Sequence, residues 1–537
     1  MAFLLAQAGT TLYKVDVTSG VATALSLPSG VTLKSTRKPR FAMLDQMVVM
    51  TNSPSRNLAI DAEGTVRVLV PEPPTHGPDP DETGTGLTGT FKFWCSFFVN
   101  DADGNLLMES PLSDYYQEIT IADKNISIGN IPLSRDSITG RNIYRSLTGG
   151  SVPYHLLSIE DNTTTEILNN TADSLLELLP SASSALVSPP GTVPGVRFKS
   201  IVEWKSRLWA VPDIASEIDS IYVTDTNKVY AWPNKIVAHP QGVDQKGVVG
   251  FGVRRNQLGF LKRVGVWMVS STSGATGINV NNLVVSQISP ERTGCVAEDS
   301  IVTINDKVYW LGRDGVWEWD DSGVHSITDE LVAPWFKKDA YFTRSRFPNA
   351  FARYNAVTNT YELHLAALGS VVEDRWVGFN LTNRKWYGPH QTALFTPTHG
   401  GHLVDANGLP LTMVGGSDGK LYTGNSANKR DGASTVIDMD CYGPFHHGDE
   451  PDAHHQWGEL SVLSNIESAG TATVTPYVGG LDAAAGTAFS HTLTTGRERL
   501  GRLGPGRLAR LRFRKNTVNQ GLTILGYELP WFTLGRR

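Results

Sequence analysis

The feature that most constrains this chain is a short pattern that recurs along most of its length. A turn is followed, within a few positions, by an apolar residue and an aromatic residue. The pattern occurs six times, around Leu12, Val229, Val266, Val316, Trp386 and Leu421. Several copies begin with Asp-Gly or a similar pair, which favours a hairpin between antiparallel strands. Such repetition is typical of β-propeller blades, and a series of β-sandwiches is the alternative.

Composition agrees with an all-β fold and limits the functional classes. Of the 537 residues, 40% are hydrophobic and only 19% are charged, while Gly (52) and Pro (29) are abundant enough to supply many turns. The net charge of −6 argues against a protein that binds nucleic acid over its whole surface. The three distant cysteines, Cys95, Cys295 and Cys441, do not suggest a disulfide framework, and they fit folding in a reducing cytosol.

The pattern is interrupted, and the interruption predicts a domain organisation. We expect the first propeller blades in residues 1–70 and the remaining blades in residues 196–433. Between them, residues 71–195 contain an inserted β-sandwich with its core at about 90–180. Linkers rich in Pro, Gly and Ser, at 71–86 and 181–196, bound this insertion. Residues 434–537 form a C-terminal β-sandwich with a basic end. A short helix is expected within residues 329–339.

Three motifs resemble catalytic or binding signatures but stand in the wrong context. The Gly-x-Ser-x-Gly pattern centred on Ser417 is followed by an expected strand, whereas a hydrolase nucleophile requires a turn into a helix. The glycine pattern starting at Gly84 follows a proline-rich segment and precedes a strand, unlike a dinucleotide-binding loop. The acidic loop starting at Asp101 has Leu112 where a calcium loop requires glutamate. We therefore predict turns at Ser417 and Asp101 and no nucleotide binding at Gly84, with no catalytic residue and no cofactor.

Histidines and aromatic residues leave alternatives open. Two pairs, His446 with His447 and His454 with His455, flank three acidic residues and provide possible zinc or nickel ligands. The spacing is unlike that of structural zinc sites, so we favour a polar loop and predict no metal. The strand aromatics fit the cores of blades better than a platform for sugars.

The basic end has a regular alternation. Arg510, Arg512 and Arg514 alternate with apolar residues, which predicts a half-buried strand with one charged face. Such a face would contact either an acidic neighbouring subunit or the phosphates of DNA, and the subunit contact is favoured.

Two regions resemble proteins of short-tailed bacteriophages. Residues 90–179, with Ile-Tyr-Arg at 143–145 and a Tyr-containing strand starting at Tyr154, resemble a fibronectin type III-like module of phage tail proteins. Residues 196–330, with Trp204, Trp267 and Trp317, resemble the blades of tail nozzle proteins. The resemblance implies a non-enzymatic virion protein in the phage tail, made in the cytoplasm of the bacterial host. It further implies a homo-oligomeric ring, usually of six copies, through which the genome is retained and ejected.

The implied partners are a tail adaptor or portal-proximal ring, tail fibres or spikes, and DNA that passes without specific binding. Two rival functions remain: a propeller enzyme that acts on carbohydrate and a receptor-binding tail protein. Residues 1–10 lack the basic flank and long apolar run of a signal peptide, and no stretch of the chain approaches the 18 apolar residues expected of a membrane span.

Overall fold

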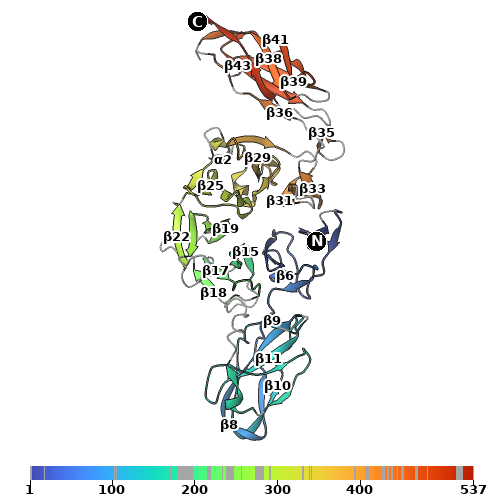
Figure 1. The fold of residues 1–537 in the computed structure, drawn as a ribbon, viewed down its shortest axis with the longest axis vertical. Helices are drawn as coiled ribbons and strands as arrows, with labels where there is room; N and C mark the ends of the chain where they lie inside the picture. The colour runs from blue at the N-terminus through green and yellow to red at the C-terminus, as the bar shows by residue number, and fades with distance from the viewer. Residues whose placement is uncertain are drawn as a thin grey trace. The chain divides into compact units, whose positions relative to one another are not determined.

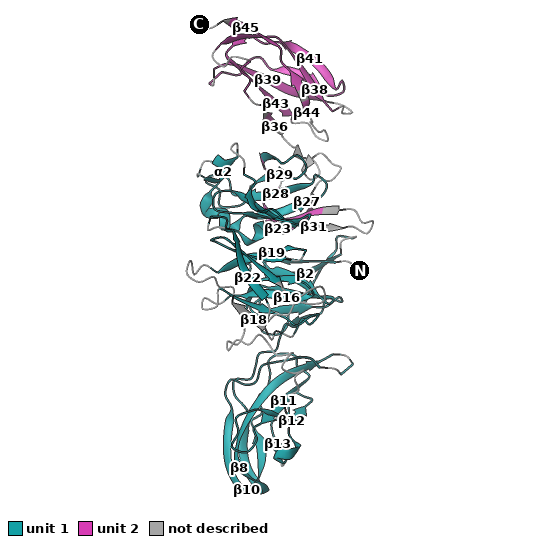
Figure 2. Ribbon diagram, turned by 60° about the vertical axis from the view of Figure 1, so that its left-hand side comes forward, with its two compact units in different colours: residues 1–388, 400–410 teal, residues 389–399, 411–537 magenta. Residues whose placement is uncertain are grey.

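The structure is a computed structural model that describes most of the chain. The described residues are 3–16, 19–101, 103–104, 106–169, 171–178, 197–213, 219–230, 232, 234–237, 247–255, 257–271, 283–289, 292–328, 332–337, 339, 341–391, 395–404, 410–424, 430–431, 435–436, 439–443, 445–448, 453–465, 470–480, 482–515 and 524–535. They are almost entirely β-stranded, which confirms the predicted all-β class. Contacts divide the chain into unit 1, residues 1–388 and 400–410, and unit 2, residues 389–399 and 411–537 (Figure 2).

Within the described residues, unit 1 contains six small sheets whose strands are joined in chain order, so each sheet is a simple meander (Figure 1). The sheets are β1 (Phe3–Ala8), β2 (Thr11–Asp16), β3 (Ala22–Ala24); β4 (Arg40–Leu44), β5 (Met47–Thr51), β6 (Leu58–Ile60), β7 (Val66–Val68); β15 (Phe198–Trp204), β16 (Arg207–Pro212), β17 (Ser220–Val223), β18 (Asn234–Val237); β19 (Val248–Arg254), β20 (Gln257–Lys262), β21 (Val266–Ser271), β22 (Leu283–Ser289); β23 (Val302–Ile304), β24 (Lys307–Leu311), β25 (Val316–Asp320), β26 (Gly323–Ser326); and β27 (Phe351–Asn355), β28 (Thr360–Leu365), β29 (Arg375–Asn380), β30 (Lys385–His390).

Consecutive sheets pack face to face, as propeller blades do. Leu44 of the second sheet packs with Tyr222 of the third, and Trp209 of the third packs with Phe260 of the fourth. Similar apolar clusters join the remaining neighbours. The first strands β4, β15, β19, β23 and β27 contact one another in this order, and the last four begin roughly fifty residues apart, a spacing typical of blades. These six described sheets of unit 1 therefore form a β-propeller, as predicted.

The recurring aromatic pattern identifies blades but does not mark equivalent strands. Val266 and Val316 begin the third strands of their sheets, whereas Leu12 lies in a second strand and Trp386 in a fourth. The strand expected around Val229 is wrong: this residue lies between β17 and β18, in a segment without strand structure. Its neighbour Trp232 is nevertheless fully buried, because burial of the indole against Phe198 requires no strand. The unequal spacing of the pattern follows from this mixture of positions.

The insertion lies between the second and third sheets, after β7 and before β15. It forms one bent seven-stranded sheet in the order β13-β10-β8-β11-β12-β14, with β9 also paired to β8. Its strands are β8 (Asp79–Asn100), β9 (Leu106–Glu109), β10 (Gln117–Gly129), β11 (Gly140–Arg145), β12 (Tyr154–Ile159), β13 (Ile167–Asn169) and β14 (Glu177–Leu178), with the 3-10 turn η1 (Asp173–Leu175). The aromatic and Ile side chains of the long strands fill its core.

The linker expected at residues 71–86 is wrong in its second half, because β8 already begins at Asp79. Pro80 is tolerated there because this part of β8 is paired only with β10, while β11 pairs with residues 93–98. The second expected linker, 181–196, lies outside the described residues. Arg56, between β5 and β6, binds Asp136 of the insertion through both guanidinium nitrogens, one of them at 2.9 Å, and Asp136 also accepts the Glu72 backbone N–H at 3.0 Å. These bonds attach the insertion to the second blade.

The chain after the sixth sheet forms another three-stranded sheet, β31 (Pro397–Val404), β32 (Pro410–Gly416) and β33 (Leu421–Gly424), and then the short hairpin β34 (Arg430–Asp431) and β35 (Thr435–Val436). The C-terminal part of unit 2 has the sheets β36-β43-β39-β40, β42-β37-β45 and β41-β38-β44 around a core that includes Trp457 and Phe513. The strands are β36 (Met439–Tyr442), β37 (His454–Trp457), β38 (Glu459–Ser464), β39 (Thr471–Gly479), β40 (Phe489–Thr492), β41 (Arg497–Arg502), β42 (Pro505–Gly506), β43 (Leu508–Lys515), β44 (Ile524–Glu528) and β45 (Trp531–Gly535).

Helical structure is confined to short segments in the described residues: η4 (Glu298–Ser300), α2 (Ala333–Lys337) and η5 (Arg344–Asn349), besides η1. The helix α2 falls within the range expected from the sequence. None of the described helices is long and apolar enough to cross a membrane.

Candidate functional site

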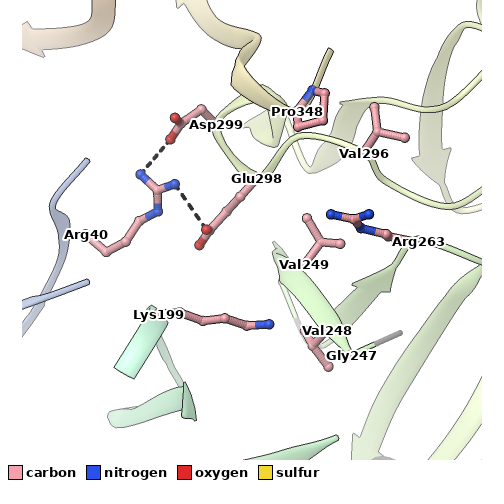
Figure 3. A pocket seen from close by; sticks show the side chains of 10 residues that line it. All are labelled: Arg40, Lys199, Gly247, Val248, Val249, Arg263, Val296, Glu298, Asp299 and Pro348. Carbon is pink, nitrogen blue, oxygen red and sulfur yellow. Dashed lines mark ion pairs between the residues drawn. The ribbon is translucent and has the colours of Figure 1, made fainter. Parts of the chain in front are cut away.

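A cavity of about 410 Å³ lies where the first strands of the blades begin. It is bordered by Arg40 at the start of β4, Lys199 near the start of β15 and Val248 at the start of β19, together with η4 and η5. Because each blade is the same meander, the starts of the first strands gather at one mouth of the propeller axis. We call this cavity the axial pocket (Figure 3).

An ion cluster occupies one wall of the axial pocket. The Arg40 guanidinium lies 2.6 Å from the Asp299 carboxylate and 3.1 Å from that of Glu298, and Lys38 Nζ lies 2.8 Å from the other Asp299 oxygen. The adjoining Ser300 hydroxyl donates to the Ala297 carbonyl at 2.6 Å and accepts the Leu311 N–H at 2.9 Å, which fixes η4. The cluster thereby connects the second blade to the segment before β23.

The environment alters the ionisation of these groups. Burial raises the pKa of Glu298, although Arg40 opposes this effect through its charge and hydrogen bond. Burial alone would lower the pKa of Arg40, but the charges of Glu298 and Asp299 outweigh it and raise that pKa. Burial lowers the pKa of Lys199, which the charges of Glu298 and Asp213 only partly offset. Perturbed pKa values in a cavity mark a candidate functional site.

None of these pocket residues was singled out from the sequence. Arg40, Lys199 and Glu298 stand far apart in the chain and belong to no motif. Only the meander topology places them together. One local signal is present in the sequence: Glu298 and Asp299 form an acidic pair shortly before the apolar segment that becomes β23 and β24.

Unit 2 contains a second polar cluster that the sequence did not reveal. The Ser464 hydroxyl lies 2.9 Å from His491 Nε2, and His491 Nδ1 lies 3.2 Å from the Glu498 carboxylate. This order of groups resembles a catalytic triad. However, Ser464 is only 3% exposed and His491 is fully buried, so a substrate has no direct access to the hydroxyl. The contacts instead join β38, β40 and β41.

The three motifs considered in the sequence are found in turns and strands. Ser417 lies in the turn between β32 and β33, where Gly419 adopts a positive φ of 78° and Tyr422 donates to Asp418 at 2.6 Å. Gly84 lies inside β8 and is followed by strand residues. Asp101 accepts the Asp103 N–H at 2.9 Å in the turn between β8 and β9.

The four histidines of the two pairs make different contacts. His446 forms a hydrogen bond with the Tyr527 hydroxyl, while His454 and His455 lie in β37, the first exposed and the second buried. Burial and the neighbouring His447 lower the pKa of His446. The acidic residues between the pairs lie outside the described residues. In the described part of the chain, no group of three or more His, Cys, Asp or Glu is arranged to bind a metal.

The arginine-rich segment forms β43 and has the predicted alternation. Ala509, Leu511 and Phe513 are buried, while Arg510 and Arg512 are half-buried and Arg514 is exposed. The neighbouring strand β39 pairs Thr475 with Arg512 on the same face. The sheet therefore presents a row of arginines on its outer side.

Comparisons with known proteins add little beyond the fold. No known family and no curated protein matches the sequence. Solved structures that resemble the chain include PorZ of the type-IX secretion system of Porphyromonas gingivalis (10% identity, 97% of this chain and 79% of that chain, TM-score 0.28). Others are an exo-β-1,3-galactanase of Phanerochaete chrysosporium (10%, 82% and 100%, 0.22) and the N-terminal domain of Nup159 (9%, 78% and 85%, 0.24). Similarity this weak carries no functional argument.

Proposed function

We propose that this chain is a structural, non-enzymatic protein of a bacteriophage tail, which forms a ring-shaped nozzle or tube segment through which the genome is retained and ejected. The sequence resemblance supplies the place in the particle. It also implies six copies, neighbouring tail rings, fibres or spikes, and passage of DNA without specific binding.

One observation carries the non-enzymatic part of the proposal. Glu298 and Asp299, the carboxylates that border the axial pocket, are both bound by Arg40, and Asp299 is also bound by Lys38. A propeller glycosidase requires carboxyl groups that are free to donate a proton and to attack or activate water. Carboxylates committed to cations serve structure better than acid–base chemistry.

The arginine row of β43 supports assembly. Arginine forms bidentate contacts with carboxylates, and the chain as a whole is acidic, so a neighbouring copy or ring offers partners for this face. If basic residues are confined to such contacts, the inner wall of the ring is neutral to negative. DNA then slides along this wall without being bound.

Electron cryo-microscopy of the particle tests the proposal directly. We expect a ring on the tail axis, and the mass of the purified protein should show whether the ring forms without its neighbours. A chain found as a peripheral fibre would instead support a receptor-binding role. A lumen lined by Lys and Arg would contradict the proposal.

A variant tests the proposed subunit contact. Combined Arg510→Glu, Arg512→Glu and Arg514→Glu should lower incorporation into particles by at least tenfold while the monomer stays folded, because the reversed charges repel an acidic neighbour. The triple variant Arg497→Glu, Arg499→Glu and Arg502→Glu on β41 is the control. Normal incorporation of the folded β43 variant would refute the contact.

A carbohydrate-active enzyme is the second candidate, because Glu298 borders a cavity and burial shifts its pKa upward, the direction that a general acid requires. Release of sugars from bacterial polysaccharides by the wild type, abolished by Glu298→Gln, would establish that activity. Absence of turnover by the wild type would remove this support.

A further inference from the structure

The axial pocket contains cations that its carboxylates do not neutralise. Lys199 and Arg263 both border the cavity, and Figure 3 shows the Arg263 guanidinium directed toward Val249 and the Lys199 side chain extending toward Val248. Among the residues that the structure describes, neither side chain has a hydrogen bond or ion pair. Lys199 is partly buried, so its charge is costly there unless water or a ligand solvates it, whereas Arg263 is exposed at the same cavity.

The acidic residues around Lys199 are each held by another cation. Asp213 is bound by Arg37 and, at 2.9 Å, by Arg197, while Asp219 lies 2.5 Å from Lys262. Glu298 and Asp299 are bound to Arg40, and Asp299 also to Lys38. The local charge balance therefore leaves Lys199 and Arg263 in excess, from two different blades that face the same space.

The geometry points to a binding site for a sugar-sized molecule that carries one phosphate or carboxylate group, with Lys199 and Arg263 as the anion-binding residues of the axial pocket. This inference does not depend on the proposed role in a phage tail.

The size and walls of the pocket define the ligand further. A cavity of about 410 Å³ far exceeds the roughly 30 Å³ that one water occupies in the liquid, so a bare inorganic anion would leave most of it filled with water. Val248, Val249, Val296 and Pro348 provide apolar surface beside the two cations. A ligand with an uncharged ring would place the ring against this apolar surface and its oxyanion between the two cations.

Protonation of Lys199 gives the site a characteristic pH dependence. Burial lowers the pKa of this amine, with Glu298, Asp213 and Asp219 opposing the effect and Arg263 adding to it. A bound anion favours the charged amine, so binding takes up protons where the free amine is partly neutral. Affinity should consequently fall as pH rises through the lowered pKa, and it should fall with salt.

Isothermal titration of the full chain tests the site with glucose 6-phosphate, glucuronate and inorganic phosphate, and with glucose as the neutral comparison. We expect binding of the two sugar anions, at least tenfold weaker binding of inorganic phosphate and no binding of glucose. Lys199→Met and Arg263→Gln should each weaken sugar-anion binding at least tenfold, while Lys199→Arg retains it.

Matched controls are Lys385→Met and Arg255→Gln, which remove an exposed lysine and an arginine that is 84% exposed. If Lys199→Met fails to fold, the exposed Arg263 decides the question through Arg263→Gln. The inference is overturned if the wild type binds neither sugar anion, if glucose binds equally well, or if the control variants lose as much affinity as the pocket variants.

Discussion

Two glutamates of unit 1 show how different surroundings give one side chain different uses. In the inserted module, Glu109 is 2% exposed, and a single carboxylate oxygen accepts hydrogen bonds from Tyr144 at 2.5 Å, Asn142 at 2.9 Å and the Ser96 hydroxyl. In the propeller, the Glu298 side chain is 20% exposed and lies beside a cavity with its cationic partner Arg40. The first network is closed, which means that it is buried away from solvent, and its donors are uncharged. The second is open, and excess positive charge borders it.

The comparison indicates that a buried network of uncharged donors stabilises a fold, whereas an open cluster can also bind a ligand. Removing a member of the closed network leaves several buried groups without partners. When a member of the open cluster is removed, water from the cavity can replace part of the lost hydrogen bonding.

The largest difference is expected in thiol reactivity. Burial raises the pKa of Cys95, in the module core, to about 12, with Glu109 adding to the shift and Arg141 opposing it. At pH 8 the thiolate fraction is then about 10⁻⁴, so iodoacetamide should modify exposed Cys441 and leave Cys95 unmodified in the native protein. Mass spectrometry of peptides measures this, with the buried Cys295 as an internal control. Rapid labelling of Cys95 would show that the module is open.

The same thiol contributes to the pH dependence of stability with a defined sign. Its pKa is about 9 when unfolded and about 12 when folded, so the folded state binds more protons between these values. The contribution of Cys95 is fully present below pH 9 and is lost as pH rises toward 12. Cys95→Ser should reduce the decline of stability over this interval in alkaline unfolding measurements.

Glu109→Ala should lower the free energy of unfolding of the module by about 3–5 kcal/mol, because it leaves the buried Tyr144 hydroxyl and Asn142 amide without their common acceptor. Hydrogen exchange at the amides of β8 and β11 reports this local loss. Glu118→Ala on β10, whose side chain is 47% exposed, is the control and should change exchange little. Equal exchange in the two variants would mean that the closed network contributes no stability.

Arg40→Met should cost less, about 1–3 kcal/mol, since Glu298 and Asp299 lose a partner but retain access to water from the pocket. Unfolding by urea, followed by hydrogen exchange in β4 and β23, measures the change. Arg67→Met is the control, because its side chain is 45% exposed and lies 3.9 Å from Asp61. A loss equal to that of Glu109→Ala would remove the distinction between open and closed clusters.

The smallest effect concerns Ser464. Ser464→Ala should lower the stability of the C-terminal domain by about 1 kcal/mol, because His491 Nε2 loses one buried hydrogen bond. Ser461→Ala in the same strand is the control. Ester hydrolysis by the wild type that disappears in Ser464→Ala would instead establish this cluster as catalytic.

The fold class and several elements follow from local patterns of residues. The alternation of apolar and polar residues predicted β43 and its charged face, because a strand of period two carries its own burial pattern. It predicted a propeller because turns and aromatics recur at the spacing of blades.

Which distant residues meet depends on how the elements pack. The residues around Val229 form no strand although Trp232 nearby is buried by tertiary packing, and β8 extends through a proline because one edge of it is unpaired there. The axial pocket draws Arg40, Lys199, Arg263 and Glu298 from different blades, and Ser464 meets His491 across two strands. Local patterns encode a strand and its buried face. Contacts between distant segments depend on how the blades stack, and no short stretch of sequence contains that information.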